Sequence, residues 1–316
     1  MANHNVVLTR CDSYESRQIA EALRRQFSLL GGLDRFVRPG DKVLLKPNLI
    51  APRSSRHACQ TDPAVILETA RLLKDFGARP FVGDSPAWGN VSASVKALKL
   101  TEPLRHLGVP VIQFDSPRTC HIGPGRTKVG ISSVALDADV VINLPKLKTH
   151  QQLVATFAVK NMFGCVSGKK KALLHFTRGG SIEQFCEMLI EIYRCVNPAL
   201  TIIDGVMAMD GPGPIRGRVR PLGWLIGGAD PIACETVCCK LVDMKPEQLP
   251  IVRTARQLGY GCGDADGIDI LGDDFSQHIV TDFELPELIG IKFSLSQVFR
   301  SIAKQILLLL KRYLGN

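Results

Sequence analysis

Three side chains that can carry positive charge lie within five residues at the end of an apolar run. The stretch INLPKLKTH, residues 142–150, begins like a buried strand and ends with Lys146, Lys148 and His150. Lysine is a compact charge that suits phosphate and carboxylate groups, and histidine exchanges a proton near neutral pH. Because a lysine flanked by apolar strand residues is costly to bury without a partner, this spacing predicts an anion-binding site. The alternative is that the three side chains lie idle in water.

Further residues of the same kind precede and follow this stretch. Lys46 ends the apolar run GDKVLLKPN. After His150 the sequence predicts a helix over about residues 152–163, which would put Thr156 and Lys160 on one face, four residues apart, with Asn161 beside them. Several lysines that converge at one place would bind a multiply charged anion. His150 and Lys160 are the predicted proton donors or acceptors.

Short β-branched runs alternate with helical patterns along the chain. The runs cover residues 5–10, 41–48, 78–85, 109–115, 138–146, 199–206, 223–230 and 267–274, and helical patterns cover residues 13–30, 62–77 and 230–244. Most runs are continuously apolar, as in strands that are covered on both faces. This order predicts an α/β fold with a mainly parallel sheet and helices on both faces.

Ligands of parallel sheets bind beyond the carboxyl ends of the strands, so the polar residues at these ends are the candidates for a site. Asp204 stands near the end of the run at 199–206 as a possible acid, base or cation-binding group, with plain turn chemistry as the alternative. Asp62 and Asp230 each stand before a proline at the start of a helical pattern, and we expect them to cap those helices.

Composition describes an ordinary globular chain with local basicity. The 316 residues are 45% hydrophobic and 22% charged, with a formal net charge of +9. Two segments without Asp or Glu, 140–182 and 288–316, hold much of that positive charge. We expect an α/β domain over 1–287, with two lobes meeting near residue 140 as a variant, and a basic amphipathic C-terminal helix over 288–316.

Cysteine usage indicates a reducing compartment. The ten cysteines include no C-x-x-C pair, and the N-terminus MANHNVVLTR has no secretory pattern. We therefore expect a cytoplasmic protein whose cysteines are mostly buried, and we predict no metal site.

The C-terminal segment suggests a surface contact. Residues 291–314 place apolar side chains at helical spacing opposite Arg300, Lys304 and Lys311, and only ILLLL is continuously apolar. This run is far shorter than the roughly 20 residues that cross a bilayer. The helix fits peripheral attachment to anionic lipid, which would make the protein membrane-associated, or packing against its own domain or a partner chain.

Four blocks of the sequence resemble a known family. GDKVLLKPNLI, ADVVINLPKLKTH, FAVKNMFGCVSG and IDGVMAMDGPGP, in this order, are similar to the family described as domain of unknown function 362. The resemblance implies an α/β domain that is often iron–sulfur-associated through a ferredoxin-like module. No ferredoxin cysteine run follows the domain here, so a redox role would require a separate ferredoxin-type electron carrier. The residues at the family's motif positions are Lys46, Asn48, Lys146, Lys148, His150, Lys160, Asn161, Asp204 and Gly205.

These observations lead to two hypotheses. The first is an enzyme, an oxidoreductase or a proton-transfer catalyst, that binds a phosphorylated or carboxylated small molecule. His150, Lys160 and Asp204 would be its catalytic residues, and the ligand-binding residues would be Lys46, Asn48, Lys146, Lys148, Asn161 and Gly205. The second is a non-catalytic anion-binding module that is tethered to a membrane or protein complex by residues 291–314. The cofactor is not specified by the sequence. Nucleic acid is a poor candidate partner because the basic segments lack interleaved aromatic residues, which are 6% of the chain.

Overall fold

A computed structural model describes residues 4–167 and 181–289. The strands are β1 (Val6–Arg10), β2 (Lys42–Pro47), β3 (Arg79–Asp84), β4 (Val111–Gln113), β5 (Pro117–Ile122), β6 (Thr127–Ser132), β7 (Val140–Leu144), β8 (Lys146–His150), β9 (Val154–Thr156), β10 (Leu200–Asp210), β11 (Arg218–Gly228) and β12 (Ile270–Gly272). The helices are α1 (Ser16–Leu29), α2 (Pro63–Asp75), α3 (Val91–Ala97), α4 (Thr101–His106), α5 (Ser133–Leu136), α7 (Ile182–Val196), α8 (Pro231–Leu241) and α9 (Pro250–Leu258), and η3 (Val159–Cys165) is a 3₁₀ segment.

The central sheet is mainly parallel, which confirms the predicted fold class. Its strand order is β12-β1-β11-β10-β7-β2-β3-β4, with β8 paired to β10 and β9 paired to β8. The run β10, β7, β2, β3, β4 is parallel, whereas β11 is antiparallel to both β10 and β1. The predicted runs at 199–206 and 223–230 are therefore the cores of a longer antiparallel hairpin.

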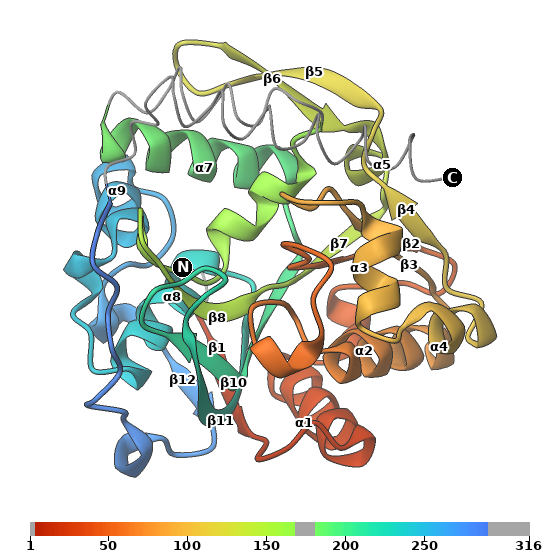
Figure 1. Ribbon diagram of the computed structural model, residues 1–316, viewed down its shortest axis with the longest axis horizontal. Coiled ribbons are helices and arrows are strands. Elements are labelled where there is room, and N and C mark those ends of the chain that lie inside the picture. The colour runs from red at the N-terminus through yellow and green to blue at the C-terminus, as the bar shows by residue number, and fades with distance from the viewer. Residues whose placement is uncertain (1–3, 168–180, 290–316) are drawn as a thin grey trace, which may run out of the picture.

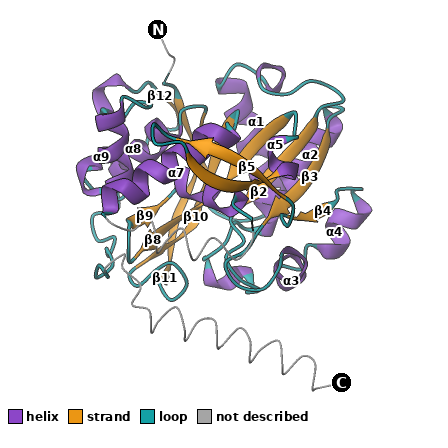
Figure 2. Ribbon diagram, turned by 90° about the horizontal axis from the view of Figure 1, so that it is seen from above, coloured by secondary structure: helices purple, strands orange, loops and turns teal. Residues whose placement is uncertain are grey.

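Helices cover both faces of the sheet, as Figures 1 and 2 show. Neighbouring residues of a strand point to opposite faces, so Leu44 of β2 packs in one core cluster and Leu45 in the other. α1 and α2 pack on the Leu45 side, and α7, α8 and α9 pack on the Leu44 side. The continuous apolar runs of the sequence are explained by this double coverage.

The caps of two helices match the prediction. Asp62 accepts a hydrogen bond from the backbone N–H of Ala64 at 2.9 Å and begins α2. Asp230 accepts from the N–H groups of Ile232 and Ala233 and begins α8. These contacts confirm both residues as helix caps.

The predicted helix over residues 152–163 is wrong. The strand expected at 138–146 ends at Leu144, and after Pro145 the chain forms a second strand, β8, which turns back as β9 and then enters η3. Residues 152–159 are all buried, so this segment has no solvent-facing stripe of the kind that an amphipathic surface helix requires. The hairpin β5–β6 was not among the predicted elements either.

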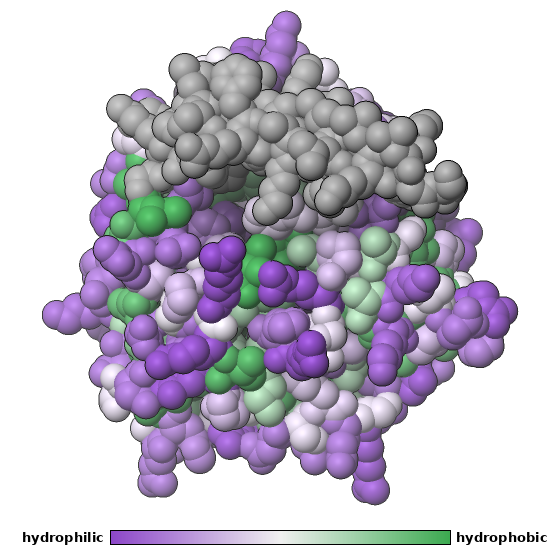
Figure 3. All heavy atoms as spheres, in the orientation of Figure 1, coloured by the Kyte–Doolittle hydropathy of each residue, from purple (hydrophilic) through white to green (hydrophobic). Residues whose placement is uncertain are grey.

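On the face seen in Figure 3, hydrophilic residues surround scattered hydrophobic ones. None of the helices in the described ranges is long and apolar enough to cross a membrane. The predicted basic helix lies outside the described residues from residue 290 onward.

Candidate functional site

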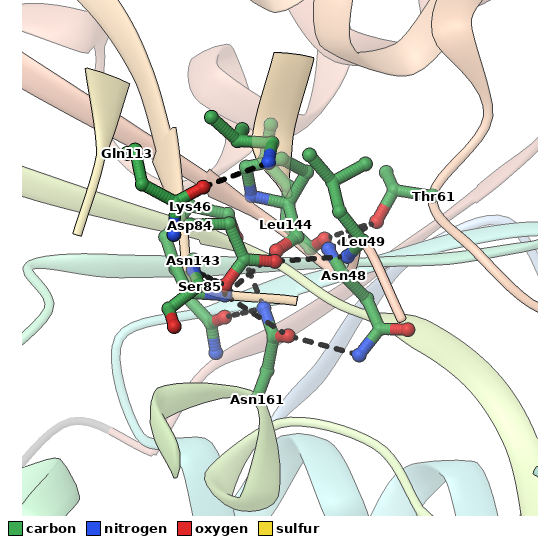
Figure 4. Close-up of polar contacts among 12 residues, drawn as sticks. Lys46, Asn48, Leu49, Thr61, Asp84, Ser85, Gln113, Asn143, Leu144 and Asn161 are labelled. Carbon is green, nitrogen blue, oxygen red and sulfur yellow. Dashed lines mark hydrogen bonds and ion pairs between the residues drawn. The ribbon is translucent and has the colours of Figure 1, made fainter. Parts of the chain in front are cut away.

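The predicted site residues come together because several strand ends meet in the middle of the sheet. Lys46 of β2 pairs in register with Asn143 of β7, and Lys146 of β8 pairs with Asp204 of β10. Successive odd or even residues of a strand share a face, so Lys146, Lys148 and His150 project to the same side of β8. These charged groups from separate segments are all buried. Figure 4 shows the part of the site around Lys46 and Asp84.

Lys46 forms an ion pair inside the protein. Its Nζ lies 2.8 Å from Oδ1 of Asp84, the last residue of β3, and both side chains are almost fully buried. Lys46 also donates to the carbonyl of Pro47 at 2.8 Å. The second oxygen of Asp84 accepts from the backbone N–H of Leu49 at 3.0 Å. A buried charge requires such partners, so this pair is a fixed part of the structure.

A glycine lies directly against this ion pair. A Cβ atom at Gly164 of η3 would lie 2.5 Å from Asp84 Oδ1 and 2.6 Å from Lys46 Nζ. Both distances are far below any normal contact, so a side chain at this position would displace the pair. The lack of space beside the ion pair therefore explains why the block FAVKNMFGCVSG has a glycine before Cys165.

Lys146 forms the second internal ion pair. Its Nζ lies 2.8 Å from Asp204 Oδ2 and donates to the hydroxyl of Tyr14 at 2.7 Å. The Tyr14 hydroxyl in turn donates to Asp204 Oδ1 at 2.7 Å, and the N–H of Asp62 donates to Asp204 Oδ2 at 2.9 Å. Burial and the negative charges of Asp204 and Asp62 raise the pKa of Tyr14 well above its usual value, so the phenol keeps its proton. Burial and Asp204 raise the pKa of Asp62 to about 6.

An amide network joins the two halves of the site. Asn161 of η3 donates to the carbonyl of Lys46 at 2.9 Å and to Asn143 Oδ1 at 2.8 Å. Its own Oδ1 accepts from Asn48 Nδ2 at 3.1 Å. The backbone N–H of Asn48 donates to the Thr61 hydroxyl at 2.8 Å. This network sets the position of η3 relative to the strand ends (Figure 4).

Lys148 and Lys160 differ from the other two lysines. Lys148 is 2% exposed, and its Nζ donates to Asn48 Oδ1 and to the carbonyl of Cys59, each at 2.6 Å. Neither acceptor is charged. The two acceptors account for two of the three N–H donors of the ammonium group. Lys160 is half-buried, and its side chain forms no hydrogen bond or ion pair with any residue within 4–167 or 181–289. The positive charge here is therefore not balanced by carboxylates as it is at Lys46 and Lys146.

The titration of these two lysines reflects their surroundings. Burial, together with the neighbouring charges of Lys160 and Lys146, lowers the pKa of Lys148 to about 7. Burial lowers the pKa of Lys160 to about 8. Both groups consequently change protonation near neutral pH, where an exposed lysine would remain charged.

The structure corrects the electrostatic premise of the sequence prediction. Four lysines do meet, but two of them are neutralised by the chain's own Asp84 and Asp204 and need no ligand to be stable. Gly205 lies against the backbone oxygen of Trp224, on the opposite side of β10 from the Asp204 side chain. His150 lies beyond Lys148 on β8, and its Nδ1 accepts from the Gln152 N–H at 3.2 Å.

The sequence analysis missed two residues of the network. Tyr14 precedes α1 and reaches Asp204 across 190 positions of the chain. Glu235 of α8 accepts from the N–H groups of Ala158 and Val159, at 3.1 and 2.7 Å, and so holds the start of η3. Burial raises the pKa of Glu235 to about 7. For Glu235 the available clue was that it is the single charged residue within the mainly apolar stretch IACETVCC.

In the part of the chain that the structure describes, no three His, Cys, Asp or Glu residues are grouped so that they could hold a metal ion. All ten cysteines lie in that part and are free thiols.

Comparison with known proteins supports the family resemblance. The family model described as "Domain of unknown function (DUF362)" matches residues 43–240, a range that includes the lysines, Asn48, Asn161 and Asp204. "Thylakoid-associated protein sll1697" of Synechocystis sp. is 38% identical over 301 residues, which cover 95% of this chain and 94% of that protein. The lactate racemase apoprotein of Thermoanaerobacterium thermosaccharolyticum is a solved structure with 14% identity and a TM-score of 0.47. The alignment covers 73% of this chain and 56% of the racemase chain.

Proposed function

The chain belongs to the DUF362 family, and we propose that it is an enzyme that binds an anionic small molecule, carboxylated or phosphorylated, beside Lys160 and Lys148. The observation that supports this proposal is the contrast among the four lysines. Lys46 and Lys146 have carboxylate partners, whereas Lys148 has neutral acceptors and Lys160 has no partner in the described ranges.

Lys160 is the residue proposed to contact the ligand. It is the only one of the four whose side chain is more than 2% exposed, so a ligand can reach it without opening the core. Lys148 is close enough for the charge of Lys160 to lower its pKa, so its protonated form adds to the positive potential there. Asn161, next to Lys160, is fixed by the amide network and keeps η3 in place.

Proton transfer is the chemistry that these groups support. A lysine with a pKa of about 8 is present in both protonation states near neutral pH, so it can give or take a proton. Asp204 is already engaged by Lys146, Tyr14 and Asp62, and we assign it a positioning role. His150, on the same face of β8, is the second proposed proton carrier.

The test is calorimetric titration with sulfate, a dianion that does not itself titrate near neutral pH. Bound sulfate would raise the pKa of both lysines, so we expect uptake of about one proton per sulfate near pH 8, seen by comparing buffers of different ionisation enthalpy. Lys160→Met and Lys148→Met should each weaken binding and reduce this uptake. Lys96→Met, the same change at an exposed lysine of α3, is the matched control.

The proposal fails under either of two results. One is that sulfate, phosphate and oxalate all produce no binding heat with the full chain. The other is that sulfate binds with the same affinity and proton uptake in the Lys148→Met and Lys160→Met variants.

A second proposed function is attachment to a membrane surface through residues 291–314. It rests on the basic amphipathic pattern of that segment and on the name of the 38% identical relative, a thylakoid-associated protein. The full chain should sediment with vesicles that contain anionic lipid, and a chain ending at residue 290 should not. Lys160→Met should sediment like the wild type, which separates attachment from ligand binding. Equal sedimentation of the full and shortened chains would refute the attachment.

A further inference from the structure

Two partly exposed cysteines from distant parts of the sequence lie against each other. Cys120 is on β5 and Cys195 is near the end of α7; the two elements pack against each other, and the Cys120 thiol is close enough to affect the titration of Cys195. Of the ten cysteines, only these two and Cys262 are not buried. Cys262 instead contacts the carbonyl of Asp264 at 3.3 Å.

A second contact fixes the approach of the two elements. Glu191 lies one helical turn before Cys195, and its Oε2 accepts from the backbone N–H of Gly123 at 3.2 Å. Gly123 follows β5 three residues after Cys120, so two successive turns of α7 face the end of this strand. Figures 1 and 2 show β5 and β6 running alongside α7. The juxtaposition of the two thiols is thus part of a wider interface.

We propose that Cys120 and Cys195 are a site of thiol–disulfide exchange, in which a small organic disulfide converts them into an intramolecular disulfide. The sulfur of Cys120 attacks one sulfur of the disulfide RSSR, its proton is lost, and one RSH leaves. Cys195 then attacks the mixed disulfide on Cys120 and releases the second RSH. Two cysteine thiols are oxidised and one RSSR is reduced to two RSH, so atoms and electrons balance.

The order of the two attacks follows from the surroundings of Cys195. Burial, the neighbouring Cys120 and the charge of Glu191 raise the pKa of Cys195 to about 11, so this residue keeps its proton and is a poor first nucleophile. Once Cys120 carries the mixed disulfide, Cys195 is already beside the sulfur that it must attack. Cys120 is thus the attacking residue and Cys195 the resolving one.

The disulfide would restrain a part of the fold that supports the site. η3, which carries Lys160, packs against α7, with Phe163 and Phe185 in edge-to-face contact at 6.1 Å. The residue after η3, Val166, bridges to Ile131 of β6. A covalent link to α7 from β5, the hairpin partner of β6, would therefore restrain both elements that contact the η3 region.

The test is peptide mapping of the folded, full-length chain after equilibration with oxidised glutathione. We expect a linked pair of peptides containing Cys120 and Cys195, lighter by two hydrogen atoms than their sum and separated by dithiothreitol. Cys195→Ser should accumulate glutathione on Cys120, and Cys120→Ser should leave Cys195 largely unmodified. Cys262→Ser is the matched control and should form the same link as the wild type.

The wild-type result decides the proposal without any variant, so a poorly folding variant does not affect it. Recovery of Cys120 and Cys195 as free thiols, or as separate glutathione adducts with no link, would overturn it. A link between two chains, or one that includes Cys262, would overturn it as well.

Discussion

The buried position of Lys148 should make protein stability depend on pH in a way that one substitution removes. Its folded pKa is about 7 against an ordinary value of 10.5, because burial disfavours the ammonium form. The unfolded chain therefore binds more protons between these two values. The contribution of Lys148 to stability is therefore least favourable below pH 7 and becomes more favourable as the pH increases through this window.

The magnitude follows from the two pKa values. Each pKa unit corresponds to about 1.4 kcal/mol, so Lys148 destabilises the folded state by up to about 5 kcal/mol at low pH. Between about pH 6 and about pH 9 this penalty should decrease by roughly 3 kcal/mol. Lys148→Met removes the titration, but it also leaves Asn48 Oδ1 and the Cys59 carbonyl without their donor, at a cost of about 1–3 kcal/mol each. The change with pH is therefore more informative than the stability at one pH.

Urea unfolding at several pH values between about 6 and 9 measures this effect. The free energy of unfolding of the wild type should rise with pH relative to that of Lys148→Met, by roughly 3 kcal/mol over the range. Lys96→Met, which changes an exposed lysine, should run parallel to the wild type. If Lys148→Met also runs parallel to the wild type, Lys148 is charged in the folded protein at all these pH values and the reasoning is refuted.

Three further predictions concern the groups around the lysines. Burial raises the pKa of Glu235 from 4.5 to about 7, so its contribution to stability falls by about 3 kcal/mol as the pH rises between these values. Glu235→Gln should abolish this pH-dependent loss, measured by urea unfolding. Gly164→Ala should lower stability by roughly 2–4 kcal/mol, measured as a lower melting temperature, because its Cβ would collide with Asp84 and its lysine partner. Asp204→Asn should destabilise by roughly 3–5 kcal/mol in urea unfolding, because it leaves Lys146 as a buried charge without a carboxylate.

Each of these three predictions would be contradicted by a specific result. The role of Glu235 is contradicted if Glu235→Gln follows the wild-type pH profile. Unchanged melting of Gly164→Ala would mean that the backbone of η3 moves away from the ion pair easily. Wild-type stability of Asp204→Asn would show that Lys146 is neutral or solvated in the folded protein.

Much of the fold could be predicted from local patterns. Continuous apolar runs identified β1, β2, β3, β4 and β7, because a strand covered on both faces has no polar side. Asp-Pro pairs located the starts of α2 and α8, because a cap and its helix are neighbours in sequence. The segment at 152–163 could not be predicted in the same way, since its residues are buried by contacts with the rest of the protein and not by a helical stripe of their own.

The candidate site could likewise be predicted only in part. The sequence by itself determined which lysines are costly to leave unpaired, because apolar neighbours in a strand imply burial of Lys46, Lys146 and Lys148. Only the tertiary structure decided which of them have carboxylate partners, because Asp84 and Asp204 reach their lysines through strand pairing and chain crossings. Coulomb interactions depend on the distance between charges in space. Two residues that lie within a few ångströms of each other can be separated by any length of chain.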